Sequence, residues 1–223
     1  MKKQFFLLFL LFAGINAFAQ KIDTIKKDNL TLVFKNTDAS FSMVTRQKLI
    51  DAFFVVYPEE MKEYNPNSLR LVTFVIDTAY KGVAATGNGV VRFNPAWFVK
   101  NPEDIDVVTH EVMHIVQNYG NKNGRGLTWL TEGIADFVRN EYGVNNVKSG
   151  WKLTDFKPTQ NYTNSYRITA RFLVWAEKNK DPKLVNKLDA ALREGKYTPD
   201  MWVQYTGKNV DDLWKEYAEN PAI

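Results

Sequence analysis

The sequence predicts an α+β fold, with a small mixed sheet and a few helices in the front half and helices alone in the back half. Two observations support this prediction. The short apolar runs typical of strands all lie before residue 94, and from there to the C-terminus apolar residues recur at helical spacing. Strands and helices are therefore segregated along the chain rather than alternating, which favours α+β over a parallel βαβ sheet.

The front half contains a long helix among its expected strands. Apolar side chains at helical spacing predict a helix over residues 41–57, which Pro58 is expected to end. Gly87-Asn88-Gly89 lies between two short apolar runs and predicts a hairpin turn. The expected strands cover residues 31–34, 71–76, 83–86 and 90–93.

Helix signals dominate the remainder. Asn101 is a favoured N-cap, Pro102 suits the first helical position, and the next two acids suit the first turn. We expect this helix to run to Tyr119, with Gly120 as its C-terminal stop. Residues 151–164 are expected to be irregular, and further helices are expected over residues 127–142, 165–179, 181–193, 199–206 and 210–219.

The N-terminus has the pattern of a secretory signal peptide. Lys2 and Lys3 precede an apolar run over residues 5–13, and Ala17-Phe18-Ala19 is a small-x-small cleavage signal. The alternative, a membrane anchor, needs a longer apolar run of roughly 20 residues. We therefore expect a signal peptide over residues 1–19, a secreted or periplasmic protein without membrane contact after processing, and one mature domain over residues 20–223. Its two sub-lobes are expected at about 20–120 and 121–223.

Composition excludes several classes of site. The chain has no cysteine, so it has no disulfide, thiolate metal site or cysteine nucleophile. Its net charge of +4 is spread among interleaved acids and bases, without a basic arm or stripe. Nucleic-acid binding is therefore not expected.

The chain's only two histidines lie in the segment His110-Glu111-Val112-Met113-His114. On a helix, residues four apart share a face, so both imidazoles can reach one cation, and Glu111 is placed to receive a proton from water. The alternative is two histidines at helical spacing by chance. That alternative leaves a polar stripe in an otherwise apolar helix without a partner, which is energetically costly.

A second helix supplies a candidate third ligand. Glu132 lies 18 positions after His114, far enough for a loop and a return. A catalytic zinc site needs three protein ligands and leaves its fourth position open. Asp136, one turn beyond Glu132, could accept the other ring N–H of a ligating histidine. The alternative for both acids is a favourable electrostatic effect at the start of a helix.

These motifs resemble a known family. His-Glu-x-x-His followed by Trp129-Leu-x-Glu-Gly-x-Ala is similar to the gluzincin metallopeptidases, in which the second motif's Glu is the third zinc ligand. The chain resembles the plant basic secretory protein family and its bacterial relatives more closely, over residues 71–217. The resemblance implies a zincin-like fold with a metal cleft between the two halves, bound Zn²⁺ and peptidase activity.

Peptide hydrolysis also needs a group that stabilises the developing oxyanion. With both histidines assigned, a tyrosine is the natural candidate. Tyr166 matches the family's tyrosine before Thr169-Ala-Arg-Phe-Leu, with Tyr162 as the alternative. Either residue could instead anchor its helix. Arg139 and Arg171 are candidate clamps for a substrate carboxylate or members of internal salt bridges.

The sequence thus predicts a secreted zinc peptidase that acts on peptides or proteins. We expect zinc-activated water as the nucleophile and Glu111 as general base. The strand at residues 90–93 is expected to hold the substrate backbone by strand addition. Two alternatives remain: a non-catalytic binding protein on a zincin scaffold, and a zinc hydrolase of a non-peptide substrate.

Overall fold

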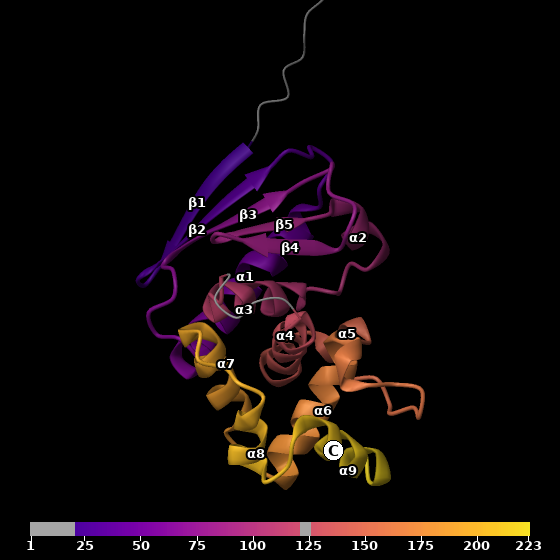
Figure 1. The fold of residues 1–223 in the computed structure, drawn as a ribbon. Coiled ribbons are helices and arrows are strands. Elements are labelled where there is room, and N and C mark those ends of the chain that lie inside the picture. Colours follow the sequence, from indigo (N-terminus) through magenta and orange to yellow (C-terminus); the bar gives the residue numbers. More distant parts are fainter. Residues whose placement is uncertain (1–20, 121–125) are drawn as a thin grey trace, which may run out of the picture.

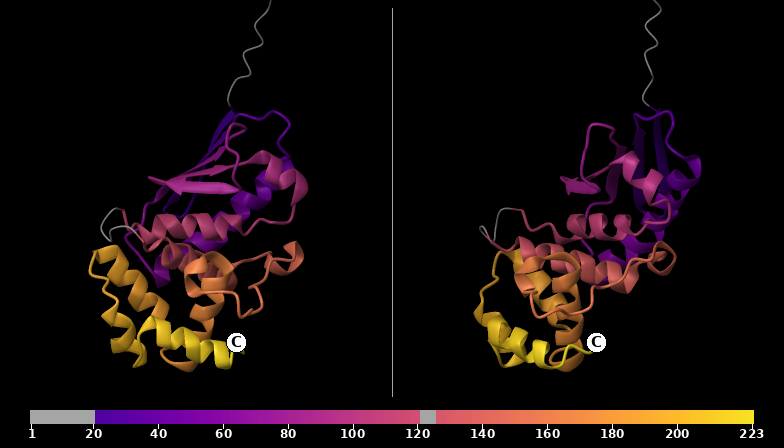
Figure 2. Two further views of the ribbon diagram at one scale, coloured as in Figure 1. Left: turned by 45° about the vertical axis from the view of Figure 1, so that its right-hand side comes forward. Right: turned by 90° about the vertical axis from the view of Figure 1, so that its right-hand side faces the viewer.

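A five-stranded sheet lies at one end of the molecule and a helical lobe at the other, with two central helices between them (Figure 1). The computed structural model describes residues 21–120 and 126–223. The expected signal peptide lies outside the described residues. The mixed architecture confirms the α+β prediction, and the two further views show the central helices below the sheet (Figure 2).

The sheet has the strand order β1-β2-β3-β5-β4. The two inner pairings, β2 with β3 and β3 with β5, are parallel, and the two outer pairings are antiparallel. Asn88 and Gly89 both have positive φ, 50° and 73°, as a tight primed hairpin turn requires. Strand β1 was not predicted, because its two apolar residues, Ile22 and Ile25, are three positions apart among polar and charged residues and do not form the alternating pattern of a strand. The strands are β1 (Lys21–Lys27), β2 (Leu30–Asn36), β3 (Leu71–Ile76), β4 (Ala84–Gly87) and β5 (Val90–Phe93).

Helix α1 (Met43–Glu63) packs under the sheet and continues through Pro58 for another turn and a half. The expectation that Pro58 ends this helix is wrong. Buried Tyr57, Glu60 and Met61 extend its core-facing side past the proline. Tertiary packing therefore outweighs the backbone hydrogen bond that proline removes.

The two central helices are α3 (Val107–Gln117) and α4 (Thr128–Tyr142). The prediction that a helix opens at Asn101 is wrong, because Asn101 instead ends the short helix α2 (Pro95–Lys100). Helix α3 begins at Val107 and ends where Asn118 adopts a left-handed conformation, with φ 43°. Nearly every residue of α3 is buried, because the helix packs against α1 and β4 of the front half and against α4 of the back half.

Helix α6 (Tyr166–Asn179) packs along α4 and also contacts two of the remaining helices, α7 and α9. These are α5 (Asn146–Ser149), α7 (Leu184–Glu194), α8 (Asp200–Thr206) and α9 (Val210–Glu219), with a 3-10 turn at Tyr162–Asn164. Aromatic rings fill this lobe around Phe172, which contacts Trp175, Trp202 and Trp214. Within residues 21–120 and 126–223, the helices lack the length and apolar character needed to cross a membrane.

Candidate metal centre

Hydrogen bonds connect the start of α3 to the segment that follows α4. Asp106 is fully buried and accepts hydrogen bonds from the backbone N–H groups of Val144 and Asn145, at 2.8 and 2.6 Å. The Thr109 hydroxyl also donates to it. Two helices that carry candidate ligands are thus joined by a satisfied buried carboxylate.

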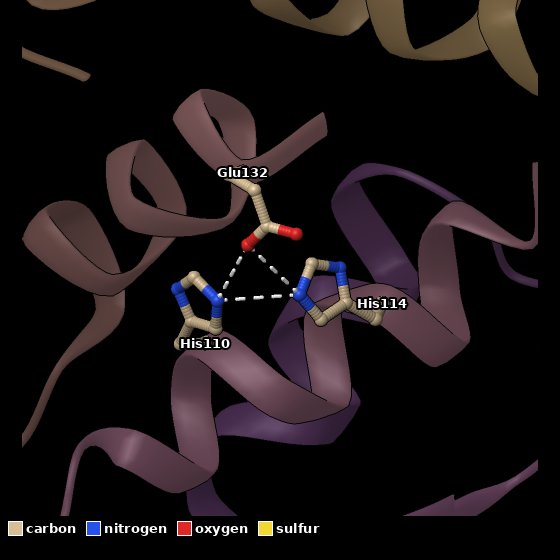
Figure 3. Close-up of side chains that lie close together, drawn as sticks. All are labelled: His110, His114 and Glu132. Carbon is tan, nitrogen blue, oxygen red and sulfur yellow. Dashed lines mark hydrogen bonds and ion pairs between the residues drawn. The ribbon is translucent and has the colours of Figure 1, made fainter. Parts of the chain in front are cut away.

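Three side chains from these helices converge on one point (Figure 3). His110 Nε2 lies 3.2 Å from His114 Nε2 and 3.2 Å from Glu132 Oε2. Glu132 Oε2 lies 3.5 Å from His114 Nε2. The structure therefore brings the three predicted ligands together, two from α3 and one from α4.

The outward-facing ring nitrogens have their own hydrogen-bond acceptors. His110 Nδ1 lies 2.7 Å from Asp136 Oδ1, and His114 Nδ1 lies 2.7 Å from Gln117 Oε1. The Gln117 amide donates to the Thr131 carbonyl at 2.9 Å, which leaves its oxygen to face His114. With Nδ1 donating outward, each imidazole in its neutral form directs the lone pair of Nε2 toward the point that it shares with Glu132.

Negative charge exceeds positive charge around the histidines. Burial opposes the charged form of His110, but hydrogen bonds to Asp136 and Glu132 raise its pKa to about 10. Burial also opposes ionisation of Glu132, yet both histidines hold its pKa well below its usual range. The site thus favours a positive charge at its centre, which a proton or a metal cation can provide.

The donor geometry fits a tetrahedral cation. Ligand distances of about 2.0–2.2 Å around zinc place tetrahedral ligand atoms about 3.3 Å apart. The three donor separations here are 3.2, 3.2 and 3.5 Å. Two imidazoles and one carboxylate are also the protein ligands of one class of catalytic zinc site. Among the described residues, His110, His114 and Glu132 form a group that could hold a metal ion.

Glu111 lies beside this group and is held by the sheet. The Thr86 hydroxyl on β4 lies 2.7 Å from Glu111 Oε2 and 3.0 Å from the Glu111 backbone carbonyl oxygen. Glu111 is only 6% exposed. One carboxylate oxygen is therefore engaged by Thr86, and the other is left for a further partner.

Tyr166 and Tyr162 lie in different surroundings. The Tyr166 ring stacks on His110, with centroids 6.0 Å apart and planes inclined by 19°, and it lines the cleft. Burial and nearby carboxylates, Glu132 first, raise its pKa, so the phenol keeps its proton at neutral pH. Tyr162 donates to Asp211 at 2.7 Å and packs on Trp129, away from the cleft.

A cleft of about 1090 Å³ runs past the three ligands, between β4 on one side and α4 and α6 on the other. His110, Glu111, His114, Glu132, Asp136 and Tyr166 all line it. The two candidate arginine clamps have partners within the protein, although Arg139 also lines the cleft. Arg139 pairs with Asp104, and Arg171 donates to the Pro221 carbonyl at 3.0 Å.

Two residues of the site were missed from the sequence, and one strand was misplaced. Gln117 is three residues after His114, a spacing that could have revealed it. No sequence pattern around Thr86 indicates its contact with Glu111, which lies 25 residues later. Strand β5 (Val90–Phe93) lies between β3 and β4, so the sheet edge beside the cleft is β4 rather than the predicted strand.

Comparison with known proteins gives the fold and the family. Legionella pneumophila aminopeptidase A, solved with aspartic acid, matches with a TM-score of 0.53 and 16% identity over 88% of this chain. An M1 zinc metallopeptidase from Deinococcus radiodurans matches with a TM-score of 0.47 and 10% identity over 92% of this chain. The chain spans 27% and 52% of the lengths of these two proteins.

The first of these likenesses shows a zincin-like fold for the chain. No curated protein matches the sequence. The model of one protein family, the peptidases of plants and bacteria, matches residues 19–217 and confirms the resemblance seen in the motifs. The chain belongs to this family of peptidases.

Proposed function

We propose that this peptidase is a secreted, zinc-dependent enzyme whose metal ligands are His110, His114 and Glu132. The observation that carries the proposal is the convergence of three lone-pair donors at 3.2–3.5 Å, two of them imidazole nitrogens whose outer N–H groups are already engaged. Such donors repel one another unless a positive charge lies between them. Zinc, when bound, supplies a Lewis acid that polarises the scissile carbonyl and lowers the pKa of a water molecule.

Glu111 serves as general base in this proposal. Thr86 holds its Oε2 at 2.7 Å, which orients the carboxylate and leaves the other oxygen to take a proton from the attacking water. Glu111 then returns that proton to the leaving amine. Because the side chain is buried, few competing waters reach the carboxylate.

Tyr166 donates its phenol proton to the substrate oxygen as negative charge develops there. Its raised pKa keeps this proton in place at neutral pH. The residue itself has φ 53°, and the preceding Ser165 has φ 64°. A bulky residue in this region is strained, and such strain persists where the surrounding structure demands it.

Strand β4 offers the substrate a backbone edge. It pairs with β5 on one side and ends the sheet of the described residues on the other. An extended peptide can add to such an edge through main-chain hydrogen bonds. Thr86 would then connect the strand that holds the peptide to the carboxylate that moves the proton.

Secretion is supported by the pattern of the N-terminus and by the start of the family match. The match begins at residue 19, beside the expected cleavage site. Mass analysis of protein recovered outside the cytoplasm should find a mature chain that begins at or near Gln20. An intact Met1 on membrane-bound protein would favour an anchor instead.

Metal analysis is the direct test of the site. Purified wild-type protein should hold about one zinc ion per chain, and His114→Ala should lose nearly all of it. Glu132→Gln keeps the size of the side chain but removes its charge, and should lower zinc affinity strongly. Asp136→Asn should lower affinity by roughly 10- to 100-fold. Equal metal in wild type and His114→Ala would rule out the site.

Activity separates an enzyme from a binding protein. Zinc-loaded wild type should cleave a mixed peptide digest, read by mass spectrometry, and a chelator should stop it. Glu111→Gln should keep zinc and fold but lose roughly 10²- to 10⁴-fold in turnover. A fully zinc-occupied wild type that cleaves no peptide would favour the binding protein or a non-peptide substrate.

A further inference from the structure

One wall of the cleft is built from two tryptophans and an ion pair. Trp97 on α2 and Trp151 after α5 are half-buried, and both line the cleft. The Trp97 indole N–H donates to Asp104 Oδ2 at 2.8 Å, and the Arg139 guanidinium lies 4.4 Å from the Trp151 ring centroid. Asp104 and Arg139 pair with each other. We call these four connected side chains the tryptophan wall.

Charge within the tryptophan wall is satisfied internally. Arg139 donates to Asp104 and to Asn146 Oδ1, the second at 3.2 Å, and its side chain is only 6% exposed. The Asp104 side chain is 13% exposed, and its two oxygens accept from Arg139 and Trp97. The wall therefore presents ring surface to the cleft and no unpaired charge. An apolar group loses little on entering such a place, whereas a charged one loses hydration without a partner.

The tryptophan wall adjoins the His110 side of the metal centre. Arg139 lies three residues beyond Asp136 on α4, and Asp104 lies three residues before α3, which carries His110 as its fourth residue. Gln117 and Tyr119 line the opposite end of the cleft, beyond His114. A peptide whose scissile bond lies over the metal centre would thus bring an adjacent side chain to the tryptophan wall.

We propose that the tryptophan wall is a specificity subsite that binds a bulky apolar side chain beside the scissile bond. This inference rests on the proposed peptidase function. Arg167 also lines the cleft and could instead attract an acidic side chain; its guanidinium donates to the Lys152 carbonyl at 3.4 Å. Arg167 is exposed, so solvent and salt screen its charge, and it selects an acidic side chain less strongly than the wall selects an apolar one.

Peptides that differ at one position test the subsite. The full mature protein, loaded with zinc, is given peptides with Phe, Leu, Ala or Glu at each position flanking the cleaved bond. On one side of that bond, kcat/KM should be at least about tenfold higher for Phe and Leu than for Ala. The ratio should fall toward one in Trp151→Ala and in Trp97→Ala. It should not change in Val99→Ala, an exposed position on the same helix as Trp97.

A binding measurement gives a second readout that does not depend on turnover. Calorimetry on the Glu111→Gln protein should show at least about tenfold tighter binding of the Phe peptide than of the Ala peptide. Adding Trp151→Ala should remove this difference. Because both readouts are ratios between two peptides on one protein, a partial loss of folded or metal-loaded protein affects both peptides alike and leaves the ratio unchanged.

Three results would overturn the subsite: no apolar preference on either side, an apolar preference that survives both tryptophan substitutions, or a preference for Glu that Arg167→Gln abolishes. A wild type that holds zinc but cleaves no peptide would instead overturn the proposed function. The calorimetric ratio would then still decide the subsite, because it requires binding and not cleavage.

Discussion

A methyl group added at Gly133 on α4 should destabilise the fold beside the candidate metal centre. A Cβ at this position would lie 2.2 Å from Thr169 Cγ2 and 2.6 Å from Thr169 Cβ, on the neighbouring helix α6. Carbon atoms in good contact are about 3.5–4.0 Å apart. Thr169 is fully buried and its hydroxyl donates to the Tyr162 carbonyl, so its side chain cannot rotate away freely.

The magnitude for Gly133→Ala follows from two opposing effects. Alanine favours the helix by about 1 kcal/mol over glycine. Overpacking costs about 1–3 kcal/mol, and overlap with two atoms of a branched side chain indicates the upper end of that range. The net loss is about 2 kcal/mol, which lowers the unfolding midpoint of a chain of this size by about 4–8 °C.

Thermal unfolding in the presence of a chelator measures this loss without the added stability that bound metal would give. Gly87→Ala is the matched control, because nothing lies within 4 Å of its added Cβ, and its midpoint should stay close to wild type. In the double variant with Thr169→Ser, removal of Cγ2 should restore part of the loss. A Gly133→Ala midpoint at or above wild type would refute the packing argument.

Single conservative substitutions test three other positions. Thr86→Val removes the donor to Glu111 and should lower kcat roughly 10- to 100-fold at unchanged zinc content, with recovery in Thr86→Ser; a wild-type kcat contradicts this. Ser165→Gly relieves a φ of 64° and should stabilise the fold by about 1 kcal/mol in chemical denaturation; a loss contradicts this. Burial raises the pKa of Glu177 to about 7, above its ordinary 4.5, so the folded state loses stability as pH rises between these values. Glu177→Gln still accepts from the Val185 N–H and should gain about 1–2 kcal/mol over wild type at pH 8 and little at pH 4; an equal gain at both contradicts this.

Local spacing was sufficient to predict which side chains converge at the candidate metal centre. Residues four apart on a helix share a face whatever packs around them, so His110 and His114 could be paired from the sequence. Glu132 could be added because 18 positions after His114 leave room for a loop and a return, and because the motif around it resembles the one that carries the third ligand in gluzincins. The Asp136 contact with His110 follows from the same helical turn.

Long-range partners of the site could not be predicted in this way. Thr86 lies 25 residues before Glu111 and reaches it because the β4 edge passes over α3. Trp97 and Trp151 contact the same ion pair, Asp104–Arg139, although one precedes α3 in the sequence and the other follows α4. Their side chains carry no pattern of their own, and only the tertiary fold brings them to one cleft.

The packing partners of small residues also could not be predicted from the sequence. Gly133 and Ala135 are small residues on either side of Ile134, and a sequence alone does not say which helix they let approach; Gly133 faces Thr169 on α6 and not α3. On a helix, Glu132 and Gly133 point about 100° apart, so the residue beside a metal ligand contacts a different neighbour. Absence of a side chain indicates close packing but does not identify the partner helix.

Helix α4 is thus held from two sides by contacts within the protein. On the α3 side its contacts are polar: Asp136 accepts from His110, and the Thr131 carbonyl accepts from Gln117. On the α6 side its contact is steric, through Gly133 against Thr169. Polar contacts set the rotation of the helix that directs Glu132 at the histidines, while the steric contact sets its distance from the back lobe. Together they hold α4 where Glu132 Oε2 lies 3.2 and 3.5 Å from the two imidazoles, so the back lobe helps to position one candidate ligand although it supplies none of the three.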